Sequence, residues 1–206
     1  MEIQTVCLYV FDTLSDWEPS FAISGINNPT YQLSPGRFIV KTASTNKSTV
    51  KTIGGITIVP DTTLAEIKPE ESAMLILPGG SGWESGQHIE ATNLAKLFLK
   101  LGKPVAAICG ATAGLAISGI LDNVRHTSNA AVYLQTTNYK GGKYYQEEAA
   151  VTDGNLITAG ATAPIEFAYH IFKKLGIYSD KTLEAWYGLF KTGELKYFLE
   201  LQEAGA

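Results

Sequence analysis

Short apolar runs of strand length alternate with helix-like segments from one end of the chain to the other. Between the runs, apolar residues recur at helical spacing, for example at Leu94, Leu97 and Leu101. Near-continuous apolar strands that alternate with helices are typical of a mainly parallel sheet with helices on both faces. We therefore predict an α/β fold, with buried strands at residues 6–11, 38–43, 73–77, 105–108 and 156–159.

The chain is long enough for one sizeable domain and a small appendage. It has 206 residues, of which 45% are hydrophobic, and this fraction excludes a mostly disordered protein. We predict an α/β domain over residues 1–177. Beyond it, residues 178–206 carry an apolar stripe at Leu183, Trp186 and Phe190. This extension is expected to form two short helices that pack on the domain or on a partner subunit.

The net charge and the number of cysteines limit the binding partners and the cellular compartment that can be expected. The formal net charge of −4 disfavours a nucleic-acid binder, which normally needs a basic surface. Two cysteines cannot supply a disulfide framework, and no basic segment precedes the first apolar run, so we expect a cytoplasmic protein. The uncharged stretch 104–121 is interrupted by glycines, which favours a buried strand and helix over a membrane span.

Cys109 is the strongest candidate for a reactive residue. It stands where the apolar strand 105–108 meets a predicted helix, with the small residues Ala107 and Ala111 two positions away on either side. A nucleophile on a sharp strand-to-helix turn needs such small neighbours, and a helix start should lower the pKa of a thiol. The alternative is a buried structural cysteine, which is the role we assign to Cys7 inside the first strand.

A glycine pair follows the predicted strand 73–77. Gly79 and Gly80 let the backbone approach a ligand closely and offer an amide to an oxyanion, although an ordinary turn would use the same residues. The spacing matches neither a dinucleotide fingerprint nor a phosphate-binding loop. We therefore predict no nucleotide and no other cofactor.

The histidines and Glu18 leave alternatives open. His126 lies 17 residues after Cys109 and is either a base that returns to the site or a polar loop residue. His88 is expected in solvent and His170 in a structural role or at the surface, and no histidine or cysteine spacing suggests a metal site. Glu18 follows the end of the first strand, at the sheet edge where ligands bind, but it also fits a helix cap.

Several segments in order resemble the ThiJ/PfpI superfamily, which includes the DJ-1-type proteins and is related in fold to class I glutamine amidotransferases. The resemblance covers about residues 3–176 and is carried by residues 58–64, 75–80, 106–112, 153–158 and 166–168. It implies a flavodoxin-like three-layer sandwich and a homodimer.

The resemblance also implies roles for individual residues. Cys109 matches the family's reactive cysteine, Glu18 the acid that hydrogen-bonds its sulfur, and His126 a histidine found near it. Gly80 and Gly110 match positions whose amides face the sulfur or an oxyanion.

Two departures from the family pattern limit which of the family's activities can be expected of this chain. The PfpI-type proteases have a histidine directly after the cysteine, where this chain has Gly110. The amidotransferases have a His-x-Glu motif near the C-terminus, where this chain has residues 163–166, without a histidine. Both departures weaken a simple transfer of protease or glutamine-hydrolysing activity.

Two classes of function follow. The first is a cysteine-dependent enzyme that acts on a small carbonyl or amide compound, either glyoxalase-like or as an intracellular protease or amidase, and so a hydrolase or lyase. The second is a non-enzymatic oxidative-stress sensor or chaperone-like protein that works through oxidation of Cys109. A ligand-sensing domain of a regulator is disfavoured because no DNA-binding module is attached.

Overall fold

Seven strands form the central sheet, in the order β5-β2-β1-β6-β7-β9-β8. The computed structural model describes residues 3–204, so the outermost residues of both predicted units lie outside the described part. The neighbours pair in parallel, except that β8 runs antiparallel to β9. The strands are β1 (Gln4–Tyr9), β2 (Phe38–Ser44), β5 (Thr62–Thr63), β6 (Ser72–Leu77), β7 (Val105–Ile108), β8 (Ala150–Asp153) and β9 (Leu156–Ala159).

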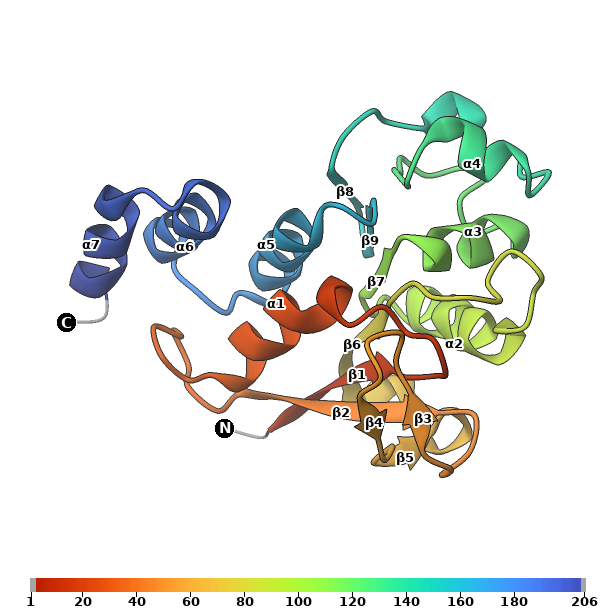
Figure 1. The fold of residues 1–206 in the computed structure, drawn as a ribbon, viewed down its shortest axis with the longest axis horizontal. Helices are drawn as coiled ribbons and strands as arrows, with labels where there is room; N and C mark the ends of the chain where they lie inside the picture. The colour runs from red at the N-terminus through yellow and green to blue at the C-terminus, as the bar shows by residue number, and fades with distance from the viewer. Residues whose placement is uncertain (1–2, 205–206) are drawn as a thin grey trace.

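Helices cover both faces of this sheet, so the predicted three-layer sandwich is confirmed. On one face, α1 (Trp17–Asn27) packs on α5 (Pro164–Leu175), and on the other, α2 (Ile89–Lys100) packs on α3 (Gly110–Ile117). Figure 1 shows these two groups on either side of the strands. The short α4 (Ala131–Gln135) contacts α3, and three 3-10 turns cover residues Leu64–Glu66, Pro69–Glu71 and Gly142–Tyr144.

The strands form where apolar residues are buried on both sides of the sheet. Every residue of β7 and β9 is buried, as are the last four of β6. A helix with a strong apolar stripe covers them, because Phe167, Ile171 and Phe172 of α5 are fully buried. The central strands β6, β7 and β9 are therefore covered on both faces.

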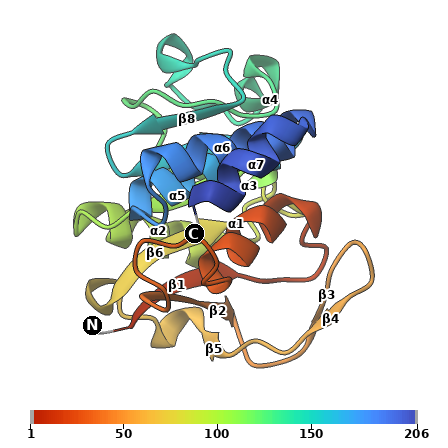
Figure 2. The ribbon, with the colours of Figure 1, turned by 90° about the vertical axis from the view of Figure 1, so that its left-hand side faces the viewer.

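The C-terminal extension consists of two helices, α6 (Asp180–Thr192) and α7 (Leu195–Ala204). Trp186 of α6 lies with its ring centroid 4.9 Å from that of Phe172 in α5. Helix α7 then packs on α6, which places it on the outside of the helical layer (Figure 2). Helix α6 thus packs on α5, and the division into units of residues 1–177 and 178–206 stays a prediction.

A small hairpin projects from the side of the domain. It pairs β3 (Val50–Lys51) with β4 (Thr57–Ile58) and forms the arm beside β2 in Figure 2. The Gly54 N–H donates to a carboxylate oxygen of Asp16 at 2.7 Å, so the tip is fastened to the start of α1. A glycine pair such as Gly54-Gly55 is typical of the turn of such a hairpin.

The carboxyl ends of the three central strands meet at one edge of the sheet. There β1 leads into the loop before α1, β6 leads into the glycine-rich loop 79–88, and β7 leads directly into Cys109. Ligands of open α/β sheets bind at this edge. No helix within residues 3–204 is long and apolar enough to cross a membrane, and the uncharged stretch 104–121 forms β7 and α3.

Candidate active site

Cys109 occupies the turn between β7 and α3 in an unusual backbone conformation. Its φ is 57° and its ψ is −125°, a combination that costs a residue with a side chain about 1–3 kcal/mol. The surrounding backbone holds it there: Cys109 donates its N–H to Ala159 at 3.0 Å and accepts two hydrogen bonds from Thr112. The side chain is half-buried. A strained residue at the ligand-binding edge is typical of a functional site.

Glu18 lies at the second position of α1 and is fully buried. The Gly79 N–H donates to its Oε2 at 2.5 Å, while Oε1 is buried and has no hydrogen-bond partner among the described residues. The residue that precedes the helix is Asp16, so Glu18 is not itself the cap. Neither capping alternative explains Glu18, because its carboxyl group points into the protein.

Gly79 brings Glu18 and Cys109 together. A Cβ atom at Gly79 would lie 2.7 Å from the Cys109 Cβ and 2.8 Å from the Glu18 Oε2. Real side chains do not approach this closely, so only glycine fits between the two residues. The two residues that the family resemblance pairs therefore meet at the edge where β1, β6 and β7 end.

Both acids of this pair are harder to ionise than usual. Burial raises the pKa of Glu18, and its hydrogen bond with Gly79 and its contact with Cys109 offset this only in part. Burial, followed by the negative charge of Glu18, raises the pKa of the Cys109 thiol to about 11. The expectation of a lowered thiol pKa is wrong for this state, because burial and a nearby carboxylate outweigh the helix start.

Asn129 is a site residue that the sequence analysis missed. Its side-chain N–H donates to the Cys109 sulfur at 3.5 Å, and its Oδ1 accepts the Ala161 N–H at 2.9 Å. This contact lowers the pKa of Cys109. Asn129 lies only three residues after His126, but nothing in the local pattern distinguishes it from other loop asparagines.

The two candidate oxyanion glycines differ in what they contact. The Gly110 amide interacts with the Cys109 sulfur and lowers its pKa. A Cβ on Gly110 would lie 2.9 Å from the Trp83 indole, so the turn needs glycine there. Gly80 has a φ of +152°, and its nearest neighbours are Phe11 and Thr13. The oxyanion role of both amides stays a prediction.

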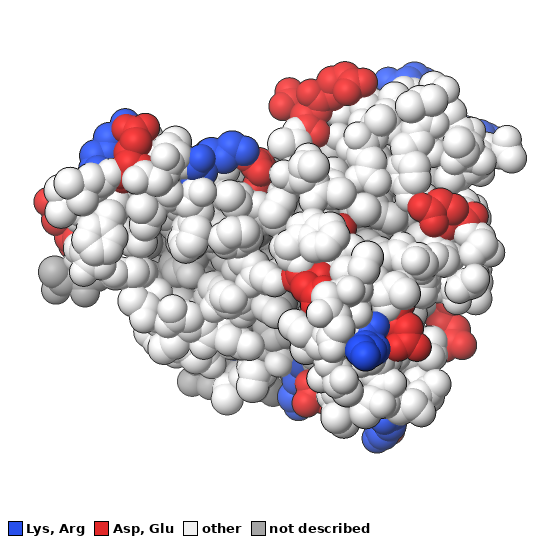
Figure 3. Space-filling view, in the orientation of Figure 1, with Lys and Arg blue, Asp and Glu red and all other residues white. Residues whose placement is uncertain are grey.

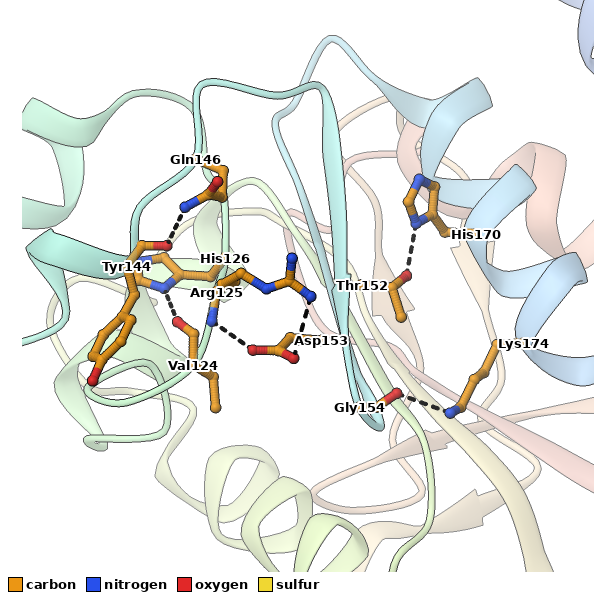
Figure 4. A network of polar contacts seen from close by, with 10 residues as sticks. All are labelled: Val124, Arg125, His126, Tyr144, Gln146, Thr152, Asp153, Gly154, His170 and Lys174. Atoms are coloured by element: carbon orange, nitrogen blue, oxygen red, sulfur yellow. Dashed lines mark hydrogen bonds and ion pairs between the residues drawn. The ribbon is translucent and has the colours of Figure 1, made fainter.

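His126 is fully buried, but no described hydrogen bond joins it to Cys109. Its Nδ1 lies 2.8 Å from the Val124 carbonyl and its Nε2 3.4 Å from the Tyr139 hydroxyl. Figure 4 shows the ring beside Arg125, whose backbone and side chain both bind Asp153. Burial lowers the pKa of His126, which favours the neutral ring. Its part in proton transfer stays a prediction.

His88 lies inside the protein, so its expected place in solvent is wrong. The glycine-rich loop folds inward and stacks the ring at 4.3 Å from Phe11 and 4.4 Å from Trp83, measured between centroids. Its Nε2 donates to the Ser81 carbonyl, which leaves Nδ1 to accept the Tyr9 hydroxyl at 2.9 Å. This aromatic cluster packs against the glycine-rich loop 79–88 from inside the protein. The Nδ1 of His170 lies 2.7 Å from the Thr152 hydroxyl (Figure 4).

Residues from opposite sides of the sheet edge frame the site. On one side, the half-exposed Trp17 donates its indole N–H to the Ala161 carbonyl at 3.2 Å. On the other side, the Tyr133 hydroxyl donates to Glu84 of the glycine-rich loop. Lysines and arginines do not gather into a patch on the face shown in Figure 3. Within residues 3–204, no group of three or more metal-ligating side chains forms a metal site.

The fold and this site define a class of protein: an α/β sandwich with a cysteine on a strained strand-to-helix turn and a buried glutamate beside it. Residues 4–174 match the model of the DJ-1/PfpI family. The chain therefore belongs to the DJ-1/PfpI family, and the predicted ThiJ/PfpI membership is confirmed. Helices α6 and α7 lie beyond the matched residues.

Two of the similar proteins cover almost the whole chain. The uncharacterized protease YoaZ of Bacillus subtilis is 43% identical over 206 residues, which cover 98% of this chain and 97% of YoaZ. A crystal structure of a ThiJ/PfpI family protein from Bacillus anthracis has 42% identity and a TM-score of 0.91 and matches 99% of both chains. A deglycase of Pyrococcus horikoshii is 29% identical over 148 residues, 71% of this chain and 88% of the deglycase.

Proposed function

We propose that this protein is a cysteine-dependent enzyme that acts on small carbonyl or amide compounds, with Cys109 as the nucleophile and Glu18 as its proton partner. The observation that carries the proposal is the contact of Cys109 and Glu18 across Gly79 at the ligand-binding edge of the sheet. Relatives named protease and deglycase support chemistry at carbonyl and amide carbons. A small molecule, and no nucleic acid or membrane, is the expected partner.

The raised pKa of Glu18 gives it a role as a proton carrier. With a raised pKa, the Glu18 carboxylate is a stronger base than usual and takes the proton of the Cys109 thiol as the sulfur attacks. The sulfur then forms a bond to the substrate carbon, and the electron pair of the C=O bond moves to oxygen. Glu18 returns a proton to that oxygen, and the amides of Gly110 and Gly80 stabilise the negative charge in between.

With a 2-oxoaldehyde, this addition gives a hemithioacetal, and a proton shift between its two carbons leads to a thioester. With an amide, the tetrahedral adduct expels the amine and leaves a thioester. Water then releases the acid and restores the thiol in either case. No oxidant or metal is required. Since Asn129 and the raised thiol pKa set the fraction of thiolate, turnover should rise with pH.

Turnover of methylglyoxal and of a panel of simple amides tests this proposal. Wild type should convert at least one class of substrate, and Cys109→Ala should abolish the reaction. Cys7→Ala serves as the matched control, because Cys7 is 3% exposed and lies away from the site in β1. Equal rates for wild type and Cys109→Ala would refute the nucleophile.

A second candidate is an oxidation sensor or chaperone-like protein, and one observation favours it. The buried Oε1 of Glu18 has no partner among the described residues, so a protonated Glu18 is free to hydrogen-bond an oxidised sulfur on Cys109. Mass spectrometry after mild peroxide should then find two added oxygens on Cys109 and none on Cys7. Oxidation of Cys7 first would contradict the assignment of the two cysteines.

We also propose a homodimer in the cytoplasm. An apolar groove of about 500 Å³ between α1, α6 and α7 supports a dimer, because it exposes Phe190 and Phe198 to the surface. Sedimentation should give the mass of two chains for wild type and of one chain for Phe198→Asp. A monomeric wild type would contradict the dimer.

A further inference from the structure

The hydrogen bond between Tyr133 and Glu84 joins two segments that lie beside the Cys109 turn. Tyr133 lies in the first turn of α4, and Glu84 lies in the glycine-rich loop after β6. A neighbour of each residue touches the Cys109 turn: Asn129 reaches the Cys109 sulfur, and Trp83 packs against Gly110. The pair therefore links the two segments that border the nucleophile.

The direction of this hydrogen bond determines what the pair offers to a ligand. An ionised carboxylate can only accept, so the phenol proton of Tyr133 points at Glu84. The remaining lone pairs of the phenol oxygen are acceptors. Burial and the charge of Glu84 raise the pKa of Tyr133, and the charges of Cys109 and Glu18 add to this. The phenol is thus neutral and lies within the electrostatic field of the nucleophile.

The ionisable groups named so far around the nucleophile are all acids, and none of them carries a positive charge. Glu18, Glu84, Cys109 and Tyr133 carry either a negative charge or none. Among the described residues, no lysine or arginine forms an ion pair with Glu18 or Glu84. A carboxylate on the substrate would meet repulsion from Glu84 here.

We propose that Tyr133, held by Glu84, is a specificity-determining residue that accepts a hydrogen bond from an O–H or N–H next to the carbon that Cys109 attacks. The substrate class is then small, uncharged carbonyl compounds with a hydroxyl or N–H beside the reacting carbon, and 2-oxo acids are disfavoured. This inference rests on the proposed function, because it assumes that Cys109 is the nucleophile.

Alkylation of Cys109 tests the inference without any turnover. Three haloacetyl probes differ in the features at issue: iodoacetamide is uncharged with an N–H donor, N,N-dimethyliodoacetamide is uncharged without one, and iodoacetate is an anion. In each reaction the thiolate forms an S–C bond and iodide leaves. Rates are measured on full-length protein carrying Cys7→Ala, and ratios between probes cancel the fraction of thiolate.

For wild type, the ratio of the iodoacetamide rate to the rate of each other probe should be larger than the same ratio measured with glutathione. Tyr133→Phe should reduce the preference over the dimethyl probe about threefold to tenfold, the value of one hydrogen bond. Glu84→Gln should reduce the preference over iodoacetate and leave Tyr133 hydrogen-bonded. The matched control is Tyr144→Phe, which removes the hydroxyl of a half-buried tyrosine in the 3-10 turn Gly142–Tyr144 and should leave every ratio unchanged.

The role of Tyr133 and the enzymatic function can fail independently, and the results distinguish the two cases. Ratios that equal those of glutathione, or that do not change in Tyr133→Phe, would overturn the role of Tyr133 even if the protein turns over substrate. Changed ratios in a protein that converts no substrate would support the role of Tyr133 and contradict the enzyme. Circular dichroism of each variant confirms that the fold is intact.

Discussion

The Glu18 carboxylate and the Cys109 side chain lie on either side of Gly79, each less than 3 Å from the place that a Cβ would take. The Gly79 N–H also holds Glu18 in position at 2.5 Å. One backbone segment after β6 thus sets the spacing of a nucleophile from β7 and an acid from α1. A substitution at Gly79, Glu18 or Cys109 should therefore change the position or the pKa of the other groups.

Gly79→Ala should separate the two residues. The new methyl group would overlap Cys109 and Glu18 and cost about 1–3 kcal/mol of unfolding free energy, as overpacking does elsewhere. Denaturant unfolding measures this loss, and the rate of alkylation of Cys109 should change with it. The matched control is Gly142→Ala, since nothing lies within 4 Å of its added Cβ. Equal stability of the two variants would contradict the close contact.

Glu18→Gln should lower the pKa of Cys109 from about 11. The substitution keeps the size of the side chain and removes the negative charge that disfavours the thiolate. Titration of thiolate absorbance in a Cys7→Ala background measures the pKa. Glu70→Gln, at an exposed glutamate near the opposite edge of the sheet, is the control. An unchanged or higher thiol pKa in Glu18→Gln would contradict the electrostatic coupling.

The stability of the protein should fall at alkaline pH through Cys109. Its pKa is about 11 in the folded state and 9.0 in an unperturbed thiol, so the unfolded chain loses the proton first. The contribution is fully present below pH 9 and is lost as the pH rises toward 11. Wild type and Cys109→Ala should therefore differ in the slope of unfolding free energy against pH in this range. Parallel curves would show that the thiol pKa is not raised.

The sequence was sufficient to predict most of the architecture, because the evidence for it is local. Apolar runs such as Val105–Ile108 fit only a strand buried on both faces, and the structure has β7 at these residues. The antiparallel β8 was missed. Its residues Ala150–Asp153 form a short edge strand of mixed polarity, which gains its partner β9 only through the fold.

The sequence was sufficient to predict those parts of the site that lie on backbone turns at the ends of strands. Small residues around Cys109 indicate the strained turn, and the end of the first strand places Glu18 near it. The direction of the thiol pKa was not predictable, since it depends on burial by distant segments. The contacts of Asn129, Glu84 and Tyr133 likewise depend on how loops pack, and loop composition does not encode this.

Asn129→Ala should raise the pKa of Cys109 and slow its alkylation at neutral pH. The amide donates to the sulfur and lowers its pKa, so its loss removes a stabilising contact of the thiolate. The expected decrease in rate is about twofold to tenfold, the range for one hydrogen bond. Asn155→Ala, whose side chain binds the Gly102 carbonyl far along the sheet, is the control. A faster reaction in Asn129→Ala would contradict this contact.

His126→Asn should reduce stability more than it reduces the reactivity of Cys109. The imidazole is fully buried and lies against the Val124 carbonyl and Tyr139, so its loss should cost about 1–3 kcal/mol of unfolding free energy. Thermal or denaturant unfolding measures this cost, and iodoacetamide measures reactivity in the same samples. The rate should change less than about twofold, a few tenths of a kcal/mol. A large loss of reactivity or turnover in a protein of unchanged stability would instead assign His126 a part in proton transfer.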